Sequence, residues 1–356
     1  LNRWNCSRDR ITALDSNPVP TTVPTIQEWN GATGTYQLTN NSRIIVQDES
    51  LYKAAQITKD DIKDLFGLEL EISNTTVKKG DILLTKENAD TTIGDQGYTL
   101  EIGDSITIKS TTYQGIFFGT RSVLQALVAS GDALTINKGE ARDYAKYEYR
   151  KFMLDVARKY MPMWYLKDFV KYASWYKFTD IQVHLNDTSY NGHSRFRLES
   201  DIPGLTATDG YYTKGEYRDF QYYAEDYGIR IVSEFDTPAH SAVFIDNNSE
   251  LGFDGTHLDI RLNSDKKETV YKFIADLYEE YMGGDNPVFV TDAFNVGLDE
   301  YNSAYKEDMT QYTQYVMDLV YNKYGKTPMA WASMGCVDSD KTKIPDYPIM
   351  DAWANY

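Results

Sequence analysis

The order of hydrophobic and polar positions divides the chain into two parts with different periodicities. From Gly34 to about residue 146, short apolar stretches rich in β-branched residues alternate with stretches of helical spacing. The expected strands are Arg43–Gln47, Asp81–Thr85, Tyr98–Ile102 and Ser105–Ser110, and the expected helices are Ser50–Phe66 and Gln114–Val128. Gly103 and Asp104 predict a hairpin turn between the last two strands. The pattern therefore predicts a small α+β domain over residues 34–146.

From residue 147 onward, apolar runs of strand length alternate with amphipathic runs of helix length. The expected strands are Lys151–Val156, Asp180–His184, Arg230–Phe235, Ala293–Val296, Pro328–Trp331 and Pro348–Trp353. The expected helices are Trp164–Lys177, Lys214–Tyr227, Lys267–Tyr281 and Ala304–Tyr324. Such alternation is typical of parallel strands joined by helical crossovers. We therefore expect an α/β fold, a (β/α)8 TIM-type barrel over residues 147–356.

Only six strands of this barrel can be counted before the chain reaches Tyr356. A barrel of this type needs eight strands, so we expect the last two strand–helix units to lie outside this sequence. At the other end, residues 1–33 are polar, and Pro18, Pro20 and Pro24 block regular structure. We expect these residues to form an N-terminal lead-in.

Polar and aromatic side chains lie at the points where the predicted barrel strands end. The carboxyl ends of the strands meet at one face of a (β/α)8 barrel, and active sites form there. We therefore expect these side chains to converge. The candidates are His184, Asp187, Asp236, His240, Asp299, Glu300, Trp331 and Trp353.

Asp299 and Glu300 are the most informative of these candidates. The apolar strand before them breaks at Gly297 and then delivers two adjacent carboxyl groups. Adjacent Asp and Glu residues are common on protein surfaces, so the pair alone does not indicate catalysis. Its position at the carboxyl end of a predicted barrel strand is what favours a catalytic role. His184 and His240 admit two interpretations, because a lone histidine is either a structural residue bonded beneath a loop or a member of the site.

Composition and charge narrow the classes of partner. Lys and Arg number 36 against 53 Asp and Glu, and the net charge of -17 repels nucleic-acid phosphates and anionic membranes. We therefore expect no nucleic-acid partner. No run of about 18 apolar residues occurs, so we expect no membrane-spanning segment. The 29 tyrosines and 6 tryptophans suit either a surface that stacks on rings or a well-filled core.

The chain begins with Leu1 and contains two cysteines, Cys6 and Cys336. Two cysteines exclude a disulfide framework and a four-cysteine zinc site, and they leave one long-range disulfide possible. A start without methionine is expected of a mature or trimmed product that has lost its signal peptide. We therefore expect a secreted or cell-surface protein of bacterial origin.

Four short motifs in the second part of the chain carry a family resemblance. They are RKFMLDVAR at residues 150–158, HLND at 184–187, EFDTPAH at 234–240 and VGLDE at 296–300. In this order they resemble the motifs of glycoside hydrolase family 20, which includes β-N-acetylhexosaminidases and lacto-N-biosidases. Residues 80–119 also resemble the small α+β domain that precedes the barrel in that family. The resemblance covers the chain from about Gly34 onward.

The resemblance implies a retaining, substrate-assisted exo-glycosidase acting on β-linked N-acetylhexosamine-containing glycans. In this mechanism the substrate's own 2-acetamido oxygen attacks the anomeric carbon and forms an oxazolinium intermediate, so no enzyme nucleophile is required. Glu300 is then implied as the general acid and base. Asp299 is implied as the carboxylate that orients the acetamide and balances the positive intermediate. No cofactor and no metal are implied, and the partner is an oligosaccharide or glycoconjugate.

The resemblance also implies residues around this pair. Arg150 is implied to hydrogen-bond sugar hydroxyls, since a guanidinium offers a fixed fork of donors. His240 is implied to position the acid, within a network that includes His184, Asp187 and Asp236. Trp331 and Trp353 are implied as aromatic walls of the sugar pocket.

Gln182 departs from the family pattern. Many hexosaminidases have His-X-His before the aspartate of the second motif, and here Gln182 stands in the place of the first histidine. Lacto-N-biosidases are similar in this respect, and a glutamine offers both a donor and an acceptor to a neighbouring sugar. The alternative function is therefore a lacto-N-biosidase that releases Gal-β1,3-GlcNAc from the non-reducing end.

Two interpretations from other classes remain open. One is a metal-dependent barrel hydrolase whose ligands are His184, Asp187, Asp236 and His240, because imidazole and carboxylate bind zinc or manganese. The other is a non-catalytic carbohydrate-binding module on the same scaffold. The Asp299–Glu300 pair argues against the second, since binding alone needs no protonated carboxyl group.

Overall fold

The computed structural model describes residues 16–188, 195–331 and 347–351, and the chain divides into two compact units. Unit 1 contains the chain up to Arg150 together with Lys171–Thr179 and Asp226–Gly228. Unit 2 contains Lys151–Val170, Asp180–Glu225 and the chain from Ile229 onward. Each unit is built on one β-sheet.

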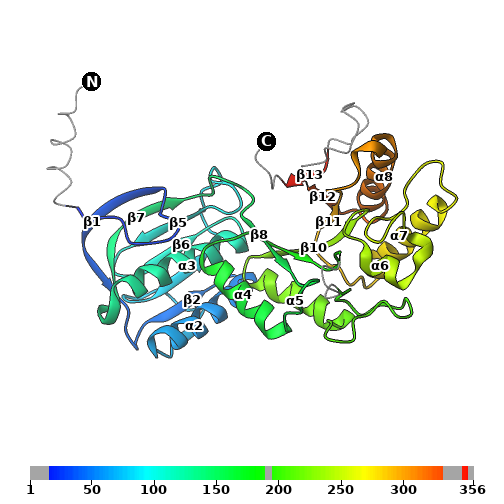
Figure 1. Cartoon of the computed structure of the whole chain (residues 1–356). Helices are drawn as coiled ribbons and strands as arrows, with labels where there is room; N and C mark the ends of the chain where they lie inside the picture. The colour runs from blue at the N-terminus through cyan, green and yellow to red at the C-terminus, as the bar shows by residue number, and fades with distance from the viewer. Residues whose placement is uncertain (1–15, 189–194, 332–346, 352–356) are drawn as a thin grey trace, which may run out of the picture. The chain divides into compact units, whose positions relative to one another are not determined.

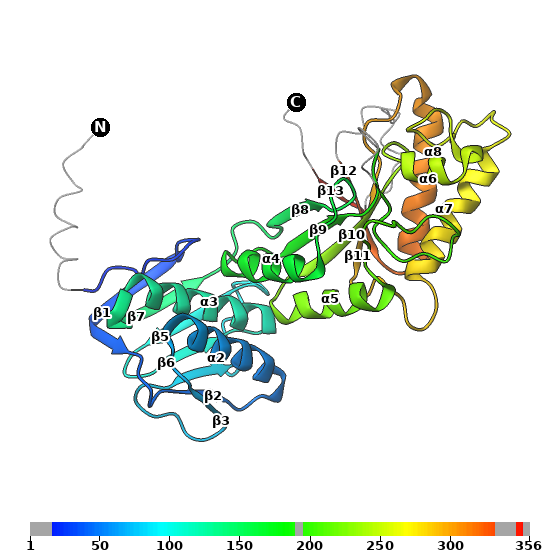
Figure 2. The same ribbon diagram turned by 60° about the horizontal axis from the view of Figure 1, so that its bottom comes forward.

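Unit 1 contains a seven-stranded mixed sheet in the order β1-β7-β5-β6-β4-β2-β3. Its strands are β1 (Glu28–Gln37), β2 (Arg43–Val46), β3 (Glu71–Ser73), β4 (Ile82–Thr85), β5 (Tyr98–Ile102), β6 (Ile106–Lys109) and β7 (Thr135–Asp143). The helices α2 (Tyr52–Phe66) and α3 (Tyr113–Ala129) cover one face of this sheet (Figures 1 and 2). Leu100, Ile108 and Phe117 are buried and belong to the core of the unit.

Local chemistry explains where the two helices of unit 1 begin or end. The side chain of Thr112 accepts a hydrogen bond from the amide of Gly115, which caps the first turn of α3. At the end of α2, Gly67 adopts a left-handed backbone with φ of 69°, the conformation that glycine provides at helix ends. The predicted hairpin is also confirmed, because β5 and β6 pair antiparallel on either side of Gly103.

The structure adds three strands to unit 1 that the hydrophobic pattern does not predict, β1, β3 and β7. The short strand β3 pairs in parallel with β2. Strands β1 and β7 pair antiparallel with each other, and β7 also pairs with β5. Most side chains of β1 are exposed, because an edge strand is held by backbone hydrogen bonds and needs few apolar residues. The sheet therefore begins at Glu28, within the lead-in expected over residues 1–33.

Unit 2 contains a six-stranded parallel sheet in the order β13-β12-β11-β10-β9-β8 within the described residues. Its strands are β8 (Lys151–Asp155), β9 (Asp180–His184), β10 (Arg230–Thr237), β11 (Ala293–Gly297), β12 (Thr327–Trp331) and β13 (Ile349–Asp351). Helices α6 (Ala242–Asn247), α7 (Lys267–Met282) and α8 (Lys306–Asp318) lie in unit 2. Helix α5 (Lys214–Asp226) lies in unit 2 up to Glu225, and α4 (Met163–Trp175) lies in unit 2 up to Val170. Figures 1 and 2 show α7 and α8 side by side.

The predicted fold class is confirmed in unit 2. Neighbouring strands pair in parallel, and helices lie between them in the chain where the sequence predicts crossovers. Every residue of β9 and β11 is buried, including the polar residues Asp180, Gln182, His184 and Asn295. The helix expected over Ala304–Tyr324 is divided into a 3-10 turn (Ser303–Tyr305), α8 and a π-helical turn (Leu319–Lys323).

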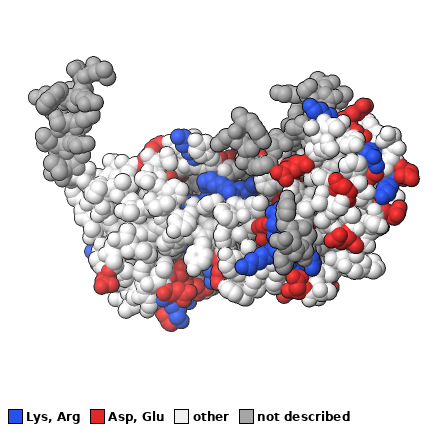
Figure 3. Space-filling model, viewed as in Figure 1, with Lys and Arg blue, Asp and Glu red and all other residues white. Residues whose placement is uncertain are grey.

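On the face shown in Figure 3, acidic and basic side chains are interspersed over unit 2. Within the described ranges, no helix has both the length and the apolar character needed to cross a membrane.

Candidate active site at the strand ends

Three turns at the carboxyl ends of β9, β10 and β11 bring candidate residues together. Because β9 pairs with β10 and β10 pairs with β11 in parallel, their carboxyl ends meet at one edge of the sheet. Asp187 follows β9, His240 follows β10, and Asp299 and Glu300 follow β11. The predicted convergence of these four side chains is observed.

His240 lies at the centre of this cluster. Its Nδ1 atom is 3.0 Å from Asp187 Oδ1, and its Nε2 atom is 3.2 Å from Glu300 Oε2 and 3.6 Å from Asp299 Oδ1. Burial opposes a positive charge on the imidazole. The hydrogen bond to Asp187 and the charges of Asp187 and Asp299 outweigh burial and raise the pKa of His240. The imidazole therefore links a buried aspartate to the carboxyl pair.

A close approach of two strands shapes the turn that carries Asp299. Gly297 has a φ of 78°, and a Cβ atom at this position would lie 1.9 Å from Asp236 Oδ1. Only glycine fits such a contact without displacement. The amide of the next residue, Leu298, donates to the carbonyl of Thr237 at 3.0 Å. This bond fastens the turn after β11 to the end of β10.

Asp236 and Asp299 are two buried carboxyl groups in the site. Burial, followed by the charge of Asp299, raises the pKa of Asp236 well above its ordinary value. Burial also raises the pKa of Asp299, and the charge of His240 opposes this effect. The Oδ1 atoms of Asp236 and Asp299 have no hydrogen-bond partner among the described residues. A buried oxygen of this kind is suited to accept a hydrogen bond from a bound molecule.

His184 is buried next to this cluster, between two carboxylates. Its Nε2 atom lies 2.7 Å from Asp187 Oδ2, and its Nδ1 atom lies 3.1 Å from Glu234 Oε2 without the alignment of a hydrogen bond. Burial opposes a charge on this imidazole, but Glu234 and Asp187 raise the pKa of His184 well above its ordinary value. Hydrogen bonds from the two histidines in turn overcome burial and lower the pKa of Asp187. The arrangement is a charged network that fixes Asp187.

Histidine and carboxylate clusters also have the composition of a metal site. The ligand atoms of His184, Glu234 and Asp236 lie within 4.8 Å of one another, as do those of Asp236, His240 and Asp299. The four ligands of the metal-dependent alternative do not form one such set among the described residues. The geometry therefore does not support the ligand set that this alternative requires.

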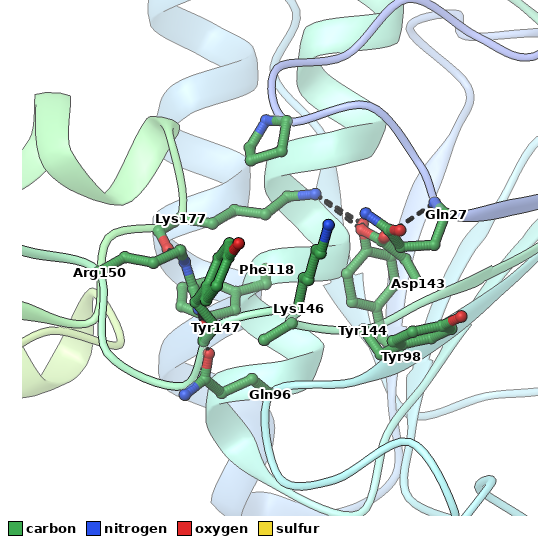
Figure 4. Close-up of a pocket in the computed structure, with 12 residues that line it drawn as sticks. Gln27, Gln96, Tyr98, Phe118, Asp143, Tyr144, Lys146, Tyr147, Arg150 and Lys177 are labelled. Carbon is green, nitrogen blue, oxygen red and sulfur yellow. Dashed lines mark hydrogen bonds and ion pairs between the residues drawn. The ribbon is translucent and has the colours of Figure 1, made fainter.

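Arg150 does not lie with these residues. It immediately precedes β8, at the amino end of the strand, whereas the site forms at the carboxyl ends. Its guanidinium donates to Gln96 Oε1 at 2.6 Å and to the carbonyl of Lys177 at 2.8 Å. Figure 4 shows these side chains around a pocket of unit 1. The structure therefore contradicts the sugar-binding role predicted for Arg150.

Arg158 is the arginine that the structure places at the carboxyl end of β8. Its Nη2 atom lies 2.6 Å from Asp187 Oδ2, and its Nη1 atom lies 2.8 Å from Asp155 Oδ2. The side chain is still 42% exposed, so it can donate to a bound molecule as well as to these carboxylates. Arg158 stands in the same motif as Arg150. Arg158 follows β8 in the chain whereas Arg150 precedes it, and this order distinguishes the arginine at the carboxyl end of the strand.

Gln182 is a residue of the sheet interior. It lies in the middle of β9 and is fully buried, with 0% of its surface exposed. Its Nε2 atom donates to Glu234 Oε2 at 2.7 Å, and its Oε1 atom accepts from Lys151 Nζ. Because both ends of the amide are occupied by protein groups, the structure contradicts the sugar contact predicted for Gln182.

Trp331 ends β12 and is partly exposed. Its indole Nε1 donates to Glu234 Oε1 at 2.8 Å, which fixes the orientation of the ring. Glu234, which the sequence did not single out, thereby connects Trp331, Gln182 and His184. The role of Trp331 as a pocket wall stays a prediction. Trp353 and the two cysteines lie outside the described residues.

Two family descriptions match the chain one after the other. Residues 19–144 match "Glycosyl hydrolase family 20, domain 2", and residues 147–355 match "Glycosyl hydrolase family 20, catalytic domain". The first match covers the sheet of unit 1, and the second covers the six parallel strands and all the site residues of unit 2.

Individual proteins show the same similarity. A lacto-N-biosidase of Bifidobacterium bifidum is 26% identical over 287 residues, which are 79% of this chain and 24% of that protein. A beta-hexosaminidase of Porphyromonas gingivalis is 22% identical over 304 residues, 78% of this chain and 38% of that protein. The structure of the GH20 beta-N-acetylhexosaminidase from Streptomyces coelicolor A3(2) superposes with a TM-score of 0.78 at 22% identity, covering 94% of this chain and 70% of that one. The chain thus spans well under half the length of these two curated relatives.

Proposed function

The chain belongs to glycosyl hydrolase family 20, and we propose that it carries out retaining, substrate-assisted hydrolysis of β-linked N-acetylhexosamine-containing glycans from their non-reducing ends. The observation that carries the proposal is the position of two carboxyl groups around one imidazole. His240 Nε2 lies 3.2 Å from Glu300 Oε2 and 3.6 Å from Asp299 Oδ1, at the carboxyl end of a parallel strand. This is the arrangement that an acid and an orienting carboxylate require.

Glu300 is the proposed general acid. Its side chain is 56% exposed, so it can reach a glycosidic oxygen that approaches the strand ends from solvent. Protonation of that oxygen lets the bond to the anomeric carbon break, and the carbon develops oxocarbenium character. The leaving sugar then departs as a neutral alcohol. In the second step the same carboxylate takes a proton from the attacking water.

Asp299 is the proposed partner of the substrate's acetamide group. Its buried carboxylate has an oxygen without a hydrogen-bond partner among the described residues, and it would accept the acetamide N–H. This contact aims the acetamide oxygen at the anomeric carbon, where it forms the new bond of the oxazolinium ion. The negative charge of Asp299 then stabilises the positive intermediate.

Release of a disaccharide is the second candidate function. A lacto-N-biosidase of Bifidobacterium bifidum is 26% identical to this chain over 79% of the chain's length, so Gal-β1,3-GlcNAc is the second candidate for the released unit. The burial of Gln182 removes the residue that the sequence offered as a distinguishing contact. The choice between the two products therefore depends on other residues around the pocket.

Initial rates on two aryl glycosides test the proposal with protein from the complete reading frame. Faster cleavage of the β-N-acetylglucosaminide would support an exo-hexosaminidase, and cleavage of the β-lacto-N-bioside alone would support a lacto-N-biosidase. Binding of both sugars without turnover would refute the enzymatic proposal and favour the carbohydrate-binding module.

The site of action is part of the proposal. Glycans with N-acetylhexosamine ends are found mostly outside the bacterial cytoplasm, so we propose that the protein is secreted or held at the cell surface. Fractionation of the native host followed by detection with an antibody tests this. Recovery only in the cytoplasmic fraction would contradict it.

A further inference from the structure

We propose that Tyr301 is a positioning residue that holds the acid Glu300 against His240 through the carbonyl of Leu258. The inference rests on the proposed function, since it concerns how the proposed acid is held. Tyr301 follows Glu300 directly in the chain but does not face the reacting groups. Its side chain is 5% exposed and points into the protein.

The turn that carries Glu300 has a backbone that its own residues do not favour. Leu298 has a φ of 83° and Glu300 a φ of 50°, both in the left-handed region. Residues with a Cβ atom seldom adopt this region unless the surrounding structure imposes it. Contacts from outside the turn are therefore needed on both sides of Glu300. On the preceding side, the amide of Leu298 donates to the carbonyl of Thr237 at 3.0 Å.

Tyr301 supplies the contact on the following side. Its hydroxyl donates to the carbonyl of Leu258 at 3.1 Å. Its ring packs edge-to-face on His257, with the ring centres 5.4 Å apart, and lies 6.4 Å from the ring of Tyr305. The hydroxyl thus fixes the backbone immediately after the acid.

Leu258 also holds the turn that carries His240. Its amide donates to the carbonyl of Pro238 at 2.8 Å, two residues before the histidine. One buried residue therefore bonds to both turns, through its amide on one side and its carbonyl on the other. The distance of 3.2 Å between His240 Nε2 and Glu300 Oε2 is set across this bridge.

The loop that contains Leu258 is itself held in place. The amide of Phe253 donates to the carbonyl of His257 at 2.8 Å, and the amide of Asp259 donates to the carbonyl of Leu251 at 2.9 Å. A third bond runs from the amide of Ser241 to the carbonyl of Thr256 at 3.0 Å. These bonds hold the carbonyl of Leu258 in a fixed position, where it accepts the hydrogen bond from the Tyr301 hydroxyl.

Tyr301→Phe removes the hydroxyl and keeps the ring packing. In the complete protein, we expect kcat on a glycoside with a poor leaving group to fall about tenfold, with KM unchanged. On a dinitrophenyl glycoside of the same sugar, whose leaving group departs without a proton, we expect kcat/KM within about twofold of wild type. Because kcat/KM reports the step in which the leaving group departs, before the attack of water that both substrates share, the ratio of kcat/KM on the two substrates is the readout.

Tyr281→Phe is the matched control. Tyr281 is buried in unit 2, and its hydroxyl donates to the carbonyl of Glu199 at 2.9 Å. This variant also loses a hydroxyl bond to a backbone carbonyl, and we expect its two rates to keep the wild-type ratio. A Tyr301→Phe variant that kept that ratio would show that Tyr301 is only a structural residue, and the inference would be overturned.

A structural readout separates this inference from the proposed function. Crystal structures of the wild-type protein and of Tyr301→Phe would show whether Glu300 moves away from His240. A displaced or multiply positioned Glu300 in the variant supports the inference, and an unchanged Glu300 overturns it. Wild-type protein that cleaves neither glycoside would refute the proposed function, while the two structures would still decide the role of Tyr301.

Discussion

His240 is the residue on which the electrostatics of the site depend. Its imidazole lies within 4 Å of four carboxyl groups, those of Asp187, Asp236, Asp299 and Glu300. Burial disfavours its charge, but the carboxylates outweigh burial and raise its pKa. A positive His240 compensates the negative charges that would otherwise repel one another where the substrate is expected to bind.

The loss of activity at acidic pH is predicted to reflect protonation of Asp299. Burial raises the pKa of Asp299 above its ordinary value of 3.8, although the charge of His240 opposes the shift. The proposed role needs the ionised carboxylate, so activity should be lost as the pH falls through this raised pKa. The dependence of kcat/KM on pH for the complete protein measures this loss. A midpoint at or below the ordinary value of an aspartate would contradict the prediction.

Substitutions of Glu300 and Asp299 are predicted to change kcat differently on glycosides with poor and with activated leaving groups. Glu300→Gln should lower kcat about 10²- to 10⁴-fold on a glycoside with a poor leaving group and much less on an activated one. Asp299→Asn should slow both substrates, because formation of the oxazolinium ion no longer has its orienting charge. Glu307→Gln, at an exposed glutamate in the first turn of α8, is the control. Wild-type rates in both site variants would mean that the site is assigned wrongly.

At the level of elements, the turn after β11 is the part of the fold that makes the site. The strand ends at Gly297, whose φ is 78°, and the chain passes so close to β10 here that a Cβ atom on Gly297 would lie 1.9 Å from Asp236 Oδ1. The parallel pairing of β10 with β11 aligns the ends of the two strands, and the turn after β11 carries the carboxyl groups of Asp299 and Glu300. The site therefore depends on how tightly two neighbouring strands approach each other.

Gly297→Ala is predicted to destabilise the protein by about 2–5 kcal/mol, because it combines a left-handed backbone with overpacking against Asp236. Gly67→Ala is the matched control. Gly67 also has a positive φ, 69°, but no atom lies within 4 Å of its added Cβ, so only about 1–2 kcal/mol is expected. Chemical denaturation measures both free energies of unfolding. Equal losses in the two variants would show that the contact with Asp236 is unimportant.

At the level of the whole molecule, the net charge of -17 is predicted to select against anionic substrates. Repulsion slows the approach of a charged glycan, and salt screens it over about 10 Å at 0.1 M ionic strength. Raising the salt from about 10 mM to about 200 mM should increase kcat/KM for a sulfated aryl glycoside by about two- to fivefold. The neutral aryl glycoside of the same sugar should show little change. A rate on the sulfated substrate that falls with salt would indicate that a local cation such as Arg158 dominates instead.

The hydrophobic pattern by itself determined the class of fold and the place of the carboxyl pair. Short segments of strand length and amphipathic segments of helical period can be recognised from the sequence alone, so β9, β10 and β11 and the helices between them are encoded locally. Once parallel strands are predicted, their carboxyl ends must lie together. The convergence of Asp187, His240, Asp299 and Glu300 follows from that rule and from the family motifs.

Only the tertiary structure decided which neighbours these residues have. Arg150 and Arg158 belong to one motif, and their roles depend on which end of β8 each one occupies. Gln182 was expected at the pocket, but its amide is bonded inside the sheet by residues distant in sequence. The pairing of β1 with β7 and the bond from Tyr301 to Leu258 likewise join distant segments. Periodicity encodes a residue's own conformation, whereas its contacts depend on the positions of segments far away in the chain.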